Sequence, residues 1–166
     1  MEKVFKNVAL LFIIHNDSIL MRRFTHQDYE VIDVFAFSFK DVNDIDVGIK
    51  DKLMSLFGKT FPYHYYGNIE SIINKEGVTA YITVKTYKVL LNEKQKVLDG
   101  YTDDVVKGGA DTFWLDKSDI KNETRLRDGD RKTYERIFDD RNIDIKIVVD
   151  QGDRWIDAKT VVYEDR

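Results

Sequence analysis

Cysteine is absent from the 166 residues of the sequence, which excludes thiol nucleophiles, disulfide bonds and thiolate metal sites. Proline occurs once, at Pro62. The early apolar run, Val8–Ile14, is far shorter than the ~20 residues that a membrane-spanning helix needs. Because no small-residue cleavage site follows this run, we expect no signal peptide. We therefore expect a cytoplasmic protein without membrane contact.

An excess of basic residues is also missing. Lysine and arginine number 26 against 30 aspartate and glutamate residues, so the net charge is −4, and no lysine-rich run occurs. This balance does not favour nucleic-acid binding, which needs a basic surface. The hydrophobic share of 43% and the charged share of 34% are typical of a globular protein, and the length fits one domain.

Glycine is sparse, so the turn signals that do occur separate the predicted strands clearly. Asn16–Ser18 and Asn74–Gly77 have the composition of tight turns. Alternation in the range 31–39 places Phe35, Phe37 and Phe39 on one side of a strand. The ranges that we expect to form strands are 8–14, 19–24, 31–39, 63–73, 78–91, 112–115 and a short piece at Val97–Leu98.

Two segments have helical periodicity. In the first, Asp41–Thr60, six apolar residues fall inside an arc of roughly 120°. Asp41 or Asn43 can cap its start, and Gly58 can end it in the left-handed conformation. We expect a second helix from about Asp130 to Arg141 and a single helical turn at 116–121. The apolar residues of the first helix are Val42, Ile45, Ile49, Leu53, Leu56 and Phe57.

The last segment, 143–166, has the pattern of a β-hairpin added to a domain that spans 1–142. Ile143, Ile145, Ile147 and Val149 alternate with mostly polar residues and form one apolar face. This face must pack on the same domain or on a second copy, and the second arrangement predicts a homodimer. The order of strands, helix, strands, helix and hairpin predicts an α+β fold with a mixed sheet flanked by helices.

Three of these segments resemble parts of the Nudix hydrolase fold. The opening hairpin, which includes Ile19–Arg23, is similar to the first hairpin of that family. The helix that ends at Gly58 lies where the family has its catalytic helix, and Thr112–Ile120 resembles its late strand with a tryptophan. The resemblance covers roughly Val4–Asp140. It implies a Nudix-like fold and, in the family's enzymes, metal-dependent hydrolysis of nucleoside diphosphate derivatives.

The family's glutamate motif, however, is missing. With its final glycine placed on Gly58, the positions of the Arg-Glu pair are Asp51 and Lys52, and those of the Glu-Glu pair are Ser55 and Leu56. Indeed, residues 41–60 contain no glutamate. In the family, these carboxylates hold Mg²⁺ against a diphosphate. We therefore expect no catalytic residue, no metal site and no cofactor at this helix.

Our first functional hypothesis is a non-catalytic Nudix-like domain that binds a nucleotide-type ligand or a protein. Arg22, Arg23 and Lys52 are the candidate contacts for a phosphate group. Alternation turns Arg22 and Arg23 to opposite sides, so at most one of them faces a given cleft. For Lys52 the alternative is a solvated surface lysine.

Two further hypotheses stay open. The first is a divergent hydrolase whose metal ligands come from Asp44, Asp51, Asp103, Asp104 and Asp111. Asp44 and Asp51 would lie ~10 Å apart along the helix axis, so one Mg²⁺ would need another ligand between them. The second is an assembly module that dimerises through the C-terminal hairpin.

The three histidines, His15, His26 and His64, lack the spacing that would let two of them chelate one metal ion. The aromatic residues of 61–66 suit either the core or the stacking of a base.

Overall fold

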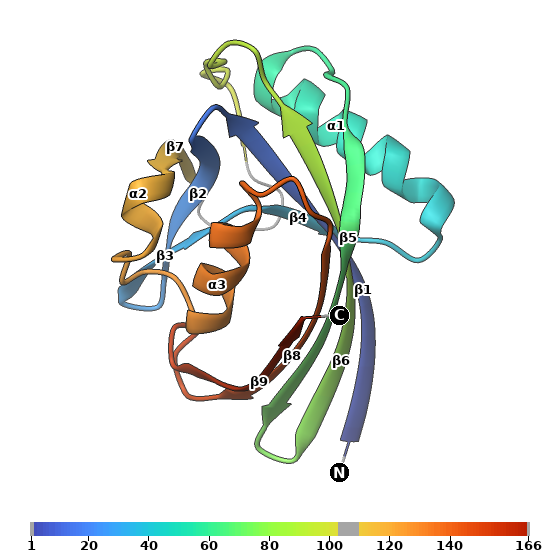
Figure 1. Cartoon of the computed structure of the whole chain (residues 1–166), viewed down its shortest axis with the longest axis vertical. Coiled ribbons are helices and arrows are strands. Elements are labelled where there is room, and N and C mark those ends of the chain that lie inside the picture. The colour runs from blue at the N-terminus through green and yellow to red at the C-terminus, as the bar shows by residue number, and fades with distance from the viewer. Residues whose placement is uncertain (1, 103–109, 166) are drawn as a thin grey trace.

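The computed structural model describes residues 2–102 and 110–165, which form nine strands and a small number of helices (Figure 1). The helical elements are η1 (Val42–Asp44), α1 (Ile45–Phe57), α2 (Lys117–Ile120) and α3 (Asp128–Arg136). None of the helices in these two ranges is long and apolar enough to cross a membrane. The strands are β1 (Glu2–His15), β2 (Ser18–His26), β3 (Tyr29–Asp33), β4 (Phe35–Ser38), β5 (His64–Lys75), β6 (Val78–Leu90), β7 (Asp111–Asp116), β8 (Ile143–Gln151) and β9 (Ala158–Asp165).

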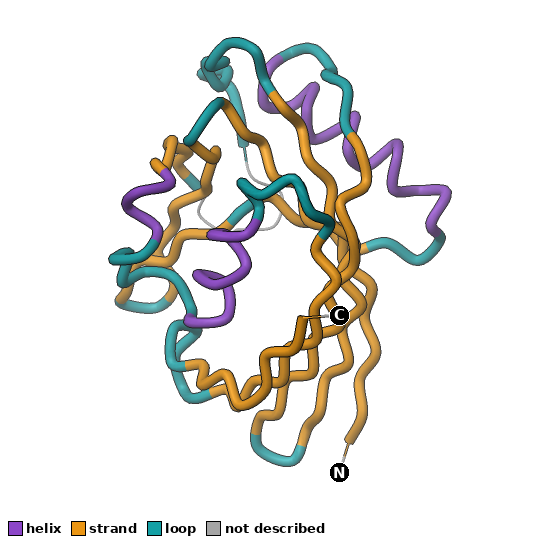
Figure 2. The backbone as a smooth tube through the Cα atoms, viewed as in Figure 1, coloured by secondary structure: helices purple, strands orange, loops and turns teal. Residues whose placement is uncertain are grey.

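All nine strands belong to one mixed sheet with the order β3-β2-β1-β6-β5-β8-β9. The two remaining strands pair alongside this path, β4 with β1 and β7 with β2. β1 runs parallel to β6 over its whole length, and β5 and β6 form the predicted hairpin across Asn74–Gly77. Helix α1 covers one face of the curved sheet and α2 and α3 cover the other (Figures 1 and 2). The predicted α+β fold is confirmed.

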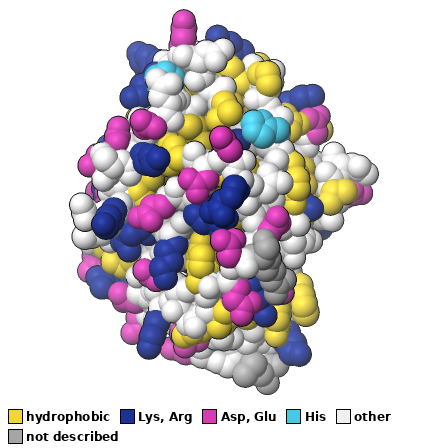
Figure 3. Space-filling view, viewed as in Figure 1, with side chains coloured by type: hydrophobic (Ala, Val, Ile, Leu, Met, Phe, Trp, Pro, Cys, Tyr) yellow, Lys and Arg dark blue, Asp and Glu magenta, His cyan; other side chains and the backbone are white. Residues whose placement is uncertain are grey.

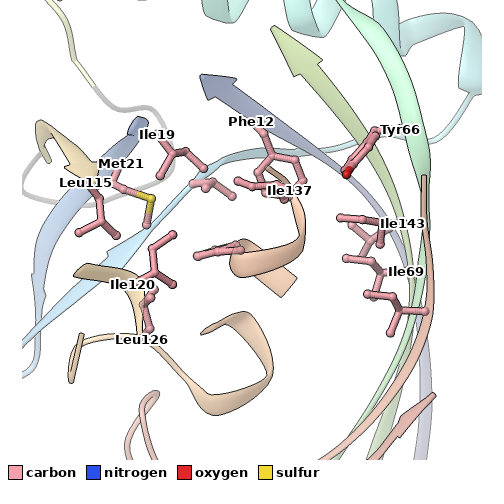
Figure 4. Close-up of a cluster of buried hydrophobic side chains, with 14 of the residues drawn as sticks. Phe12, Ile19, Met21, Tyr66, Ile69, Leu115, Ile120, Leu126, Ile137 and Ile143 are labelled. Atoms are coloured by element: carbon pink, nitrogen blue, oxygen red, sulfur yellow. The ribbon is translucent and has the colours of Figure 1, made fainter. Parts of the chain in front are cut away.

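Two apolar clusters fill the space between the sheet and its helices, and alternation along β1 assigns its residues to them. Leu11 and Ile13 belong to the cluster that also contains Ile49 and Leu53 of α1. Phe12 points the other way, into the cluster that Figure 4 shows between the sheet, α2 and α3. Strand alternation on a sheet covered on both faces explains why this strand is apolar at consecutive positions.

Helix α1 begins and ends close to the predicted limits. The Asp41 side chain caps η1, the turn directly before α1, by accepting a hydrogen bond from the Asn43 amide at 2.9 Å, and Gly58 ends α1 with φ of 73°. Ile45, Ile49, Leu53, Leu56 and Phe57 are buried as predicted. Val42 is a correction, because it lies in η1 and is 58% exposed. The 3₁₀ turn has a tighter winding than the α-helix, so the helical periodicity does not extend back to it.

Three boundaries differ from the prediction. Residues 31–39 form two strands, because β3 pairs with β2 while β4 pairs with β1. No strand includes Val97 and Leu98; instead, the Leu98 amide donates to the carbonyl oxygen of Leu56 at 2.8 Å. The late helix, α3, spans Asp128–Arg136 rather than 130–141.

The C-terminal hairpin is present, and it extends the sheet of the same chain. β8 pairs in parallel with β5 from Gly67↔Ile143 to Asn74↔Asp150, and β9 pairs with β8 on the outside. The alternating apolar residues of β8 are buried against α3. The turn of the hairpin is held by Trp155, whose ring lies 3.9 Å from the Arg127 guanidinium and whose amide donates to the Tyr29 hydroxyl.

Candidate functional site

The solvent-facing side of α1 is the position at which the family resemblance predicts chemistry. Asp44 precedes the helix as its cap, and Asp51 lies within it; both are exposed. Asp111 is the exposed first residue of β7, whereas Asp103 and Asp104 lie outside the described residues. Over residues 2–102 and 110–165, no group of three His, Asp or Glu side chains could hold a metal ion.

Leu56, which takes the place of a family glutamate, belongs to the core. Its side chain is fully buried in the cluster beneath α1. A glutamate here would need to bury a charge, at a large cost in free energy. The helix is therefore oriented so that this position supports packing and cannot present a carboxylate to solvent.

Aromatic side chains lie beside α1. Gly48 faces Phe37 of β4 so closely that an added Cβ would come within 2.3 Å of the ring. Phe35 is 1% exposed and meets the Tyr101 ring edge-to-face at 6.4 Å. Packing between α1, β4 and the segment after β6 is thus apolar among the described residues, and a larger side chain at position 48 would displace the Phe37 ring.

Arg22, a predicted phosphate contact, is 4% exposed and makes an ion pair with Asp33 at 3.2 Å. The Asp33 carboxylate also accepts hydrogen bonds from the Tyr134 hydroxyl at 3.2 Å and the Val34 amide at 2.7 Å. Burial raises the pKa of Asp33, although Arg22 opposes this shift, and burial raises the pKa of Tyr134. The guanidinium of Arg22 is therefore engaged in a buried network between β2, β3 and α3.

Arg23 and Lys52 lie in two other environments. The Arg23 guanidinium stacks over the Phe113 ring at 5.1 Å, and Arg125 approaches the same ring at 5.5 Å. Arg125 in turn makes ion pairs with Glu123 and Glu30. Lys52 is partly exposed on α1. The structure thus gives the three predicted phosphate contacts separate surroundings, and their role in binding a ligand stays a prediction.

Lys88 is a charged residue that the sequence reasoning missed. It is 6% exposed; its ammonium lies 3.5 Å from the centre of the Tyr66 ring and donates to the carbonyl oxygen of Asp139 at 3.0 Å. The Tyr66 hydroxyl donates to the carbonyl oxygens of Arg136 and Asp139 at 3.0 and 2.7 Å. Burial lowers the pKa of Lys88 to about 8 and raises that of Tyr66 to about 12.

These two side chains satisfy carbonyl groups at the end of α3, where backbone acceptors lack partners within the helix and where a positive charge is favourable. A signal was present in the sequence, because Lys88 continues the inward-facing alternation of Val84 and Thr86 along β6. A lysine at such a position predicts a buried partner.

Two open hollows in the described part of the surface are not predominantly basic. One, of about 510 Å³, lies on β5, β6 and β8 and is lined by Asn68, Ile69, Glu70, Thr83, Asp144 and Ile145. Another, of about 550 Å³, lies beside α2 and is lined by Asp17, Asp116, Lys117, Ser118, Lys121 and Glu135. On the face that Figure 3 shows, acidic and basic side chains are interspersed. The first hollow has no cationic side chain, and in the second three carboxylates accompany two lysines, so neither presents a net positive charge to a diphosphate.

Comparison of the structure with solved structures finds Nudix proteins. The MutT protein from Bacillus halodurans superposes with a TM-score of 0.70 at 14% identity, covering 96% of both chains. A MutT protein from Methanosarcina mazei gives a TM-score of 0.57 at 13% identity, covering 84% of this chain and 96% of its own. The C-terminal domain of mouse MUTYH, crystallised with human PCNA, gives 0.52 at 9% identity, covering 80% of this chain and 86% of its own.

Comparison of the sequence finds no family model and no curated protein that matches this chain. Identities this low support conclusions about fold alone. Structural agreement across almost the whole chain nevertheless confirms the resemblance on which the sequence reasoning relied. The chain has the fold of the MutT and Nudix hydrolases.

Proposed function

We propose that this chain is a non-catalytic Nudix-like domain that binds a protein partner. The observation that carries the proposal is the composition of α1. Residues 41–60 contain no glutamate, a lysine and a serine occupy two of the motif positions, and Leu56 is buried in the core. The aspartates that remain on this helix belong to no group of three metal-binding side chains among the described residues, so the helix alone does not offer the set of oxygen ligands with which Mg²⁺ activates a diphosphate.

A protein partner is favoured over a nucleotide by the state of the arginines. Arg22 is committed to Asp33, and Arg23 lies over Phe113, so neither is presented with the other to one phosphate group. The hollow on β5, β6 and β8 has acidic and no basic side chains, and in the hollow beside α2 three carboxylates outnumber the two lysines, so neither attracts a diphosphate. The MUTYH domain supports the same reading, because it has this fold and was crystallised with a protein.

The second candidate is a divergent metal-dependent hydrolase of nucleoside diphosphate derivatives. Two observations favour it: the fold is that of the MutT proteins, and Asp44, Asp51 and Asp111 are exposed. These three residues do not form a metal cluster in the described part of the chain. The candidate therefore requires further ligands from Asp103 or Asp104.

Product formation separates the two candidates. The folded chain is incubated with ADP-ribose, NADH, dinucleoside polyphosphates, nucleotide sugars and nucleoside triphosphates, each with Mg²⁺ or Mn²⁺ and with a chelator control. We expect no chelator-sensitive product. Metal-dependent turnover that is lost in Asp51→Asn, and retained in the matched variant Asp46→Asn on the same helix, would establish the hydrolase instead.

Nucleotide binding without turnover is tested by thermal unfolding with the same compounds. A ligand present at about 100 times its Kd stabilises a folded protein by about 2.7 kcal/mol. For a domain of this size, such a gain raises Tm by roughly 5–10 °C. We expect no shift of this size. A shift that disappears in Lys52→Met would identify a nucleotide-type ligand at α1 and contradict the proposal of a protein partner.

A further inference from the structure

The N-terminal part of β1 has an open backbone edge. β6 pairs with one side of β1 from Glu2 onward, whereas β4 pairs with the other side only from Val8. Phe39 adds one hydrogen bond, from its amide to the carbonyl oxygen of Asn7 at 3.1 Å. No strand within 2–102 or 110–165 pairs with the outer side of residues 2–6, and Figure 1 shows this part of β1 at the border of the sheet, beside β6.

Lys3 and Phe5 present the open hydrogen-bonding groups of this edge. Asn7 directs its carbonyl oxygen away from β6, and Glu2 directs its amide toward Gly77 on the β6 side. Because the N–H and C=O of a residue point to the same side of a strand and alternate along it, Lys3 and Phe5 point outward like Asn7. Phe5 is also 74% exposed, with its ring stacked on Tyr81 at 5.2 Å.

Open edges of this kind pair with other strands unless they are protected. β9, an outer strand of the same sheet, is interrupted by a register shift opposite Val148 and Val149, and β3 spans only Tyr29–Asp33. A bulge and a short length are both devices that oppose edge pairing. The β1 edge has neither device and carries three charges instead: Glu2, Lys3 and Lys6.

The geometry points to a second copy of this chain as the occupant of the β1 edge, paired antiparallel and centred on Val4. A continuous sheet across a two-fold axis requires the axis to be perpendicular to the sheet, so paired residues must lie on the same face of each copy. The residue on the two-fold axis then lies opposite the same residue of the second copy. Within residues 2–6 we compare the three registers in which this central residue is Lys3, Val4 or Phe5.

Two of these registers conflict with the structure. Centring on Lys3 puts this residue opposite Lys3 of the second copy, and directly opposed like charges destabilise a sheet. Centring on Phe5 pairs Lys3 with Asn7, whose carbonyl oxygen already accepts from Phe39. The register centred on Val4 avoids both conflicts.

In the register centred on Val4, both outward-pointing residues and two of the three charges at the edge have partners. Lys3 of each copy lies opposite Phe5 of the other, and these two outward-pointing residues exchange backbone hydrogen bonds. Glu2 of each copy lies opposite Lys6 of the other, giving two pairs of opposite charge. The charges that would repel an arbitrary strand thus select an antiparallel copy of the same segment.

Charge reversal tests this register by sedimentation velocity over a dilution series of the full chain. Glu2→Lys alone opposes lysine to lysine at both ends, and Lys6→Glu alone opposes glutamate to glutamate. We expect each to raise the dimer dissociation constant about tenfold or more. An equimolar mixture of the two variants restores opposite charges at both positions, so it forms a heterodimer with near wild-type affinity. The double variant restores the homodimer.

Two further variants test whether the dimer depends on the backbone of the β1 edge and not on the net charge of the chain. Phe5→Pro removes an outward amide, which an edge strand tolerates, so it abolishes the dimer while circular dichroism and Tm stay close to those of the wild type. Lys159→Glu makes the same charge change on β9 and leaves the dimer intact. A wild-type chain that stays monomeric up to about 1 mM would overturn the inference. So would a dimer that dissociates in Lys159→Glu, or two single variants that fail to associate when mixed.

Discussion

The environment of Lys88 predicts that the free energy of unfolding increases as the pH is raised into the alkaline range, and that replacing Lys88 removes this increase. Its ammonium is buried over Tyr66, and its pKa falls from 10.5 to about 8 in the folded chain. The unfolded chain therefore binds this proton more tightly than the folded chain does. Between the two pKa values the unfolded state holds more protons, so the free energy of unfolding increases with pH. Below the folded-state pKa of about 8, Lys88 is charged in both states, and the folded chain bears the full cost of burying the charged ammonium.

The size of this effect follows from the shift. A change from 10.5 to about 8 corresponds to roughly 3 kcal/mol of differential interaction. Because solvent at the margin of the site screens part of it, we expect a rise of about 1 to 2 kcal/mol between about pH 7 and pH 10. Above pH 10 the raised pKa of Tyr66 acts in the opposite direction, because the unfolded phenol ionises first.

Lys88→Met is the matched variant, because it keeps an unbranched side chain only one atom shorter and removes the titrating group. In this variant the carbonyl oxygen of Asp139 still accepts a hydrogen bond from the Tyr66 hydroxyl. Urea unfolding of both proteins across this pH range gives the free energy of unfolding directly. We expect the wild-type curve to rise relative to that of Lys88→Met. Parallel curves for the two proteins would refute the assignment of a depressed lysine pKa at this position.

Two further substitutions test the packing that holds the fold. In Gly67→Ala, the new Cβ would come within 1.6 Å of the Ile143 carbonyl oxygen, and φ is +124°, so we expect chemical denaturation to show a loss of more than about 3 kcal/mol. Gly77→Ala is its control, because φ is +80° with open space around it, and it should lose only about 1 kcal/mol. Arg22→Met leaves the partly buried Asp33 carboxylate without its ion-pair partner, which costs up to about 3–5 kcal/mol. Adding Asp33→Asn should recover part of this loss, and a strictly additive double-mutant cycle would contradict the coupling.

Local periodicity was sufficient to predict most elements. The spacing of Ile49 and Leu53 in α1 and of Ile145 and Ile147 in β8 reflects the face that each element buries, and this face is written directly into the sequence. The break at Val34 was not predictable in this way. It arises because β1 and β2 diverge and take different partners, which depends on pairing between distant strands.

The candidate site was predicted less completely than the fold. The absence of glutamate from α1 is visible in the sequence, but the burial of Leu56 and the aromatic packing around Gly48 are tertiary facts. Likewise, the sequence suggests that Arg22 is available to a ligand, whereas the structure shows that it makes an ion pair with Asp33 on the neighbouring strand. Charged residues near a cleft can be predicted from spacing, whereas their partners follow only from three-dimensional arrangement.

The parallel pairing of β1 with β6 and of β5 with β8 has a consequence for synthesis on the ribosome. Glu2 pairs beside Val78, and Gly67 beside Ile143, so neither pairing can begin until a long stretch of chain has emerged. The β5–β6 hairpin is local and can close early, but its β5 edge stays unpaired until β8 has been made. The nascent chain therefore exposes an aggregation-prone edge on β5 until residues 143–151 have emerged and paired with it.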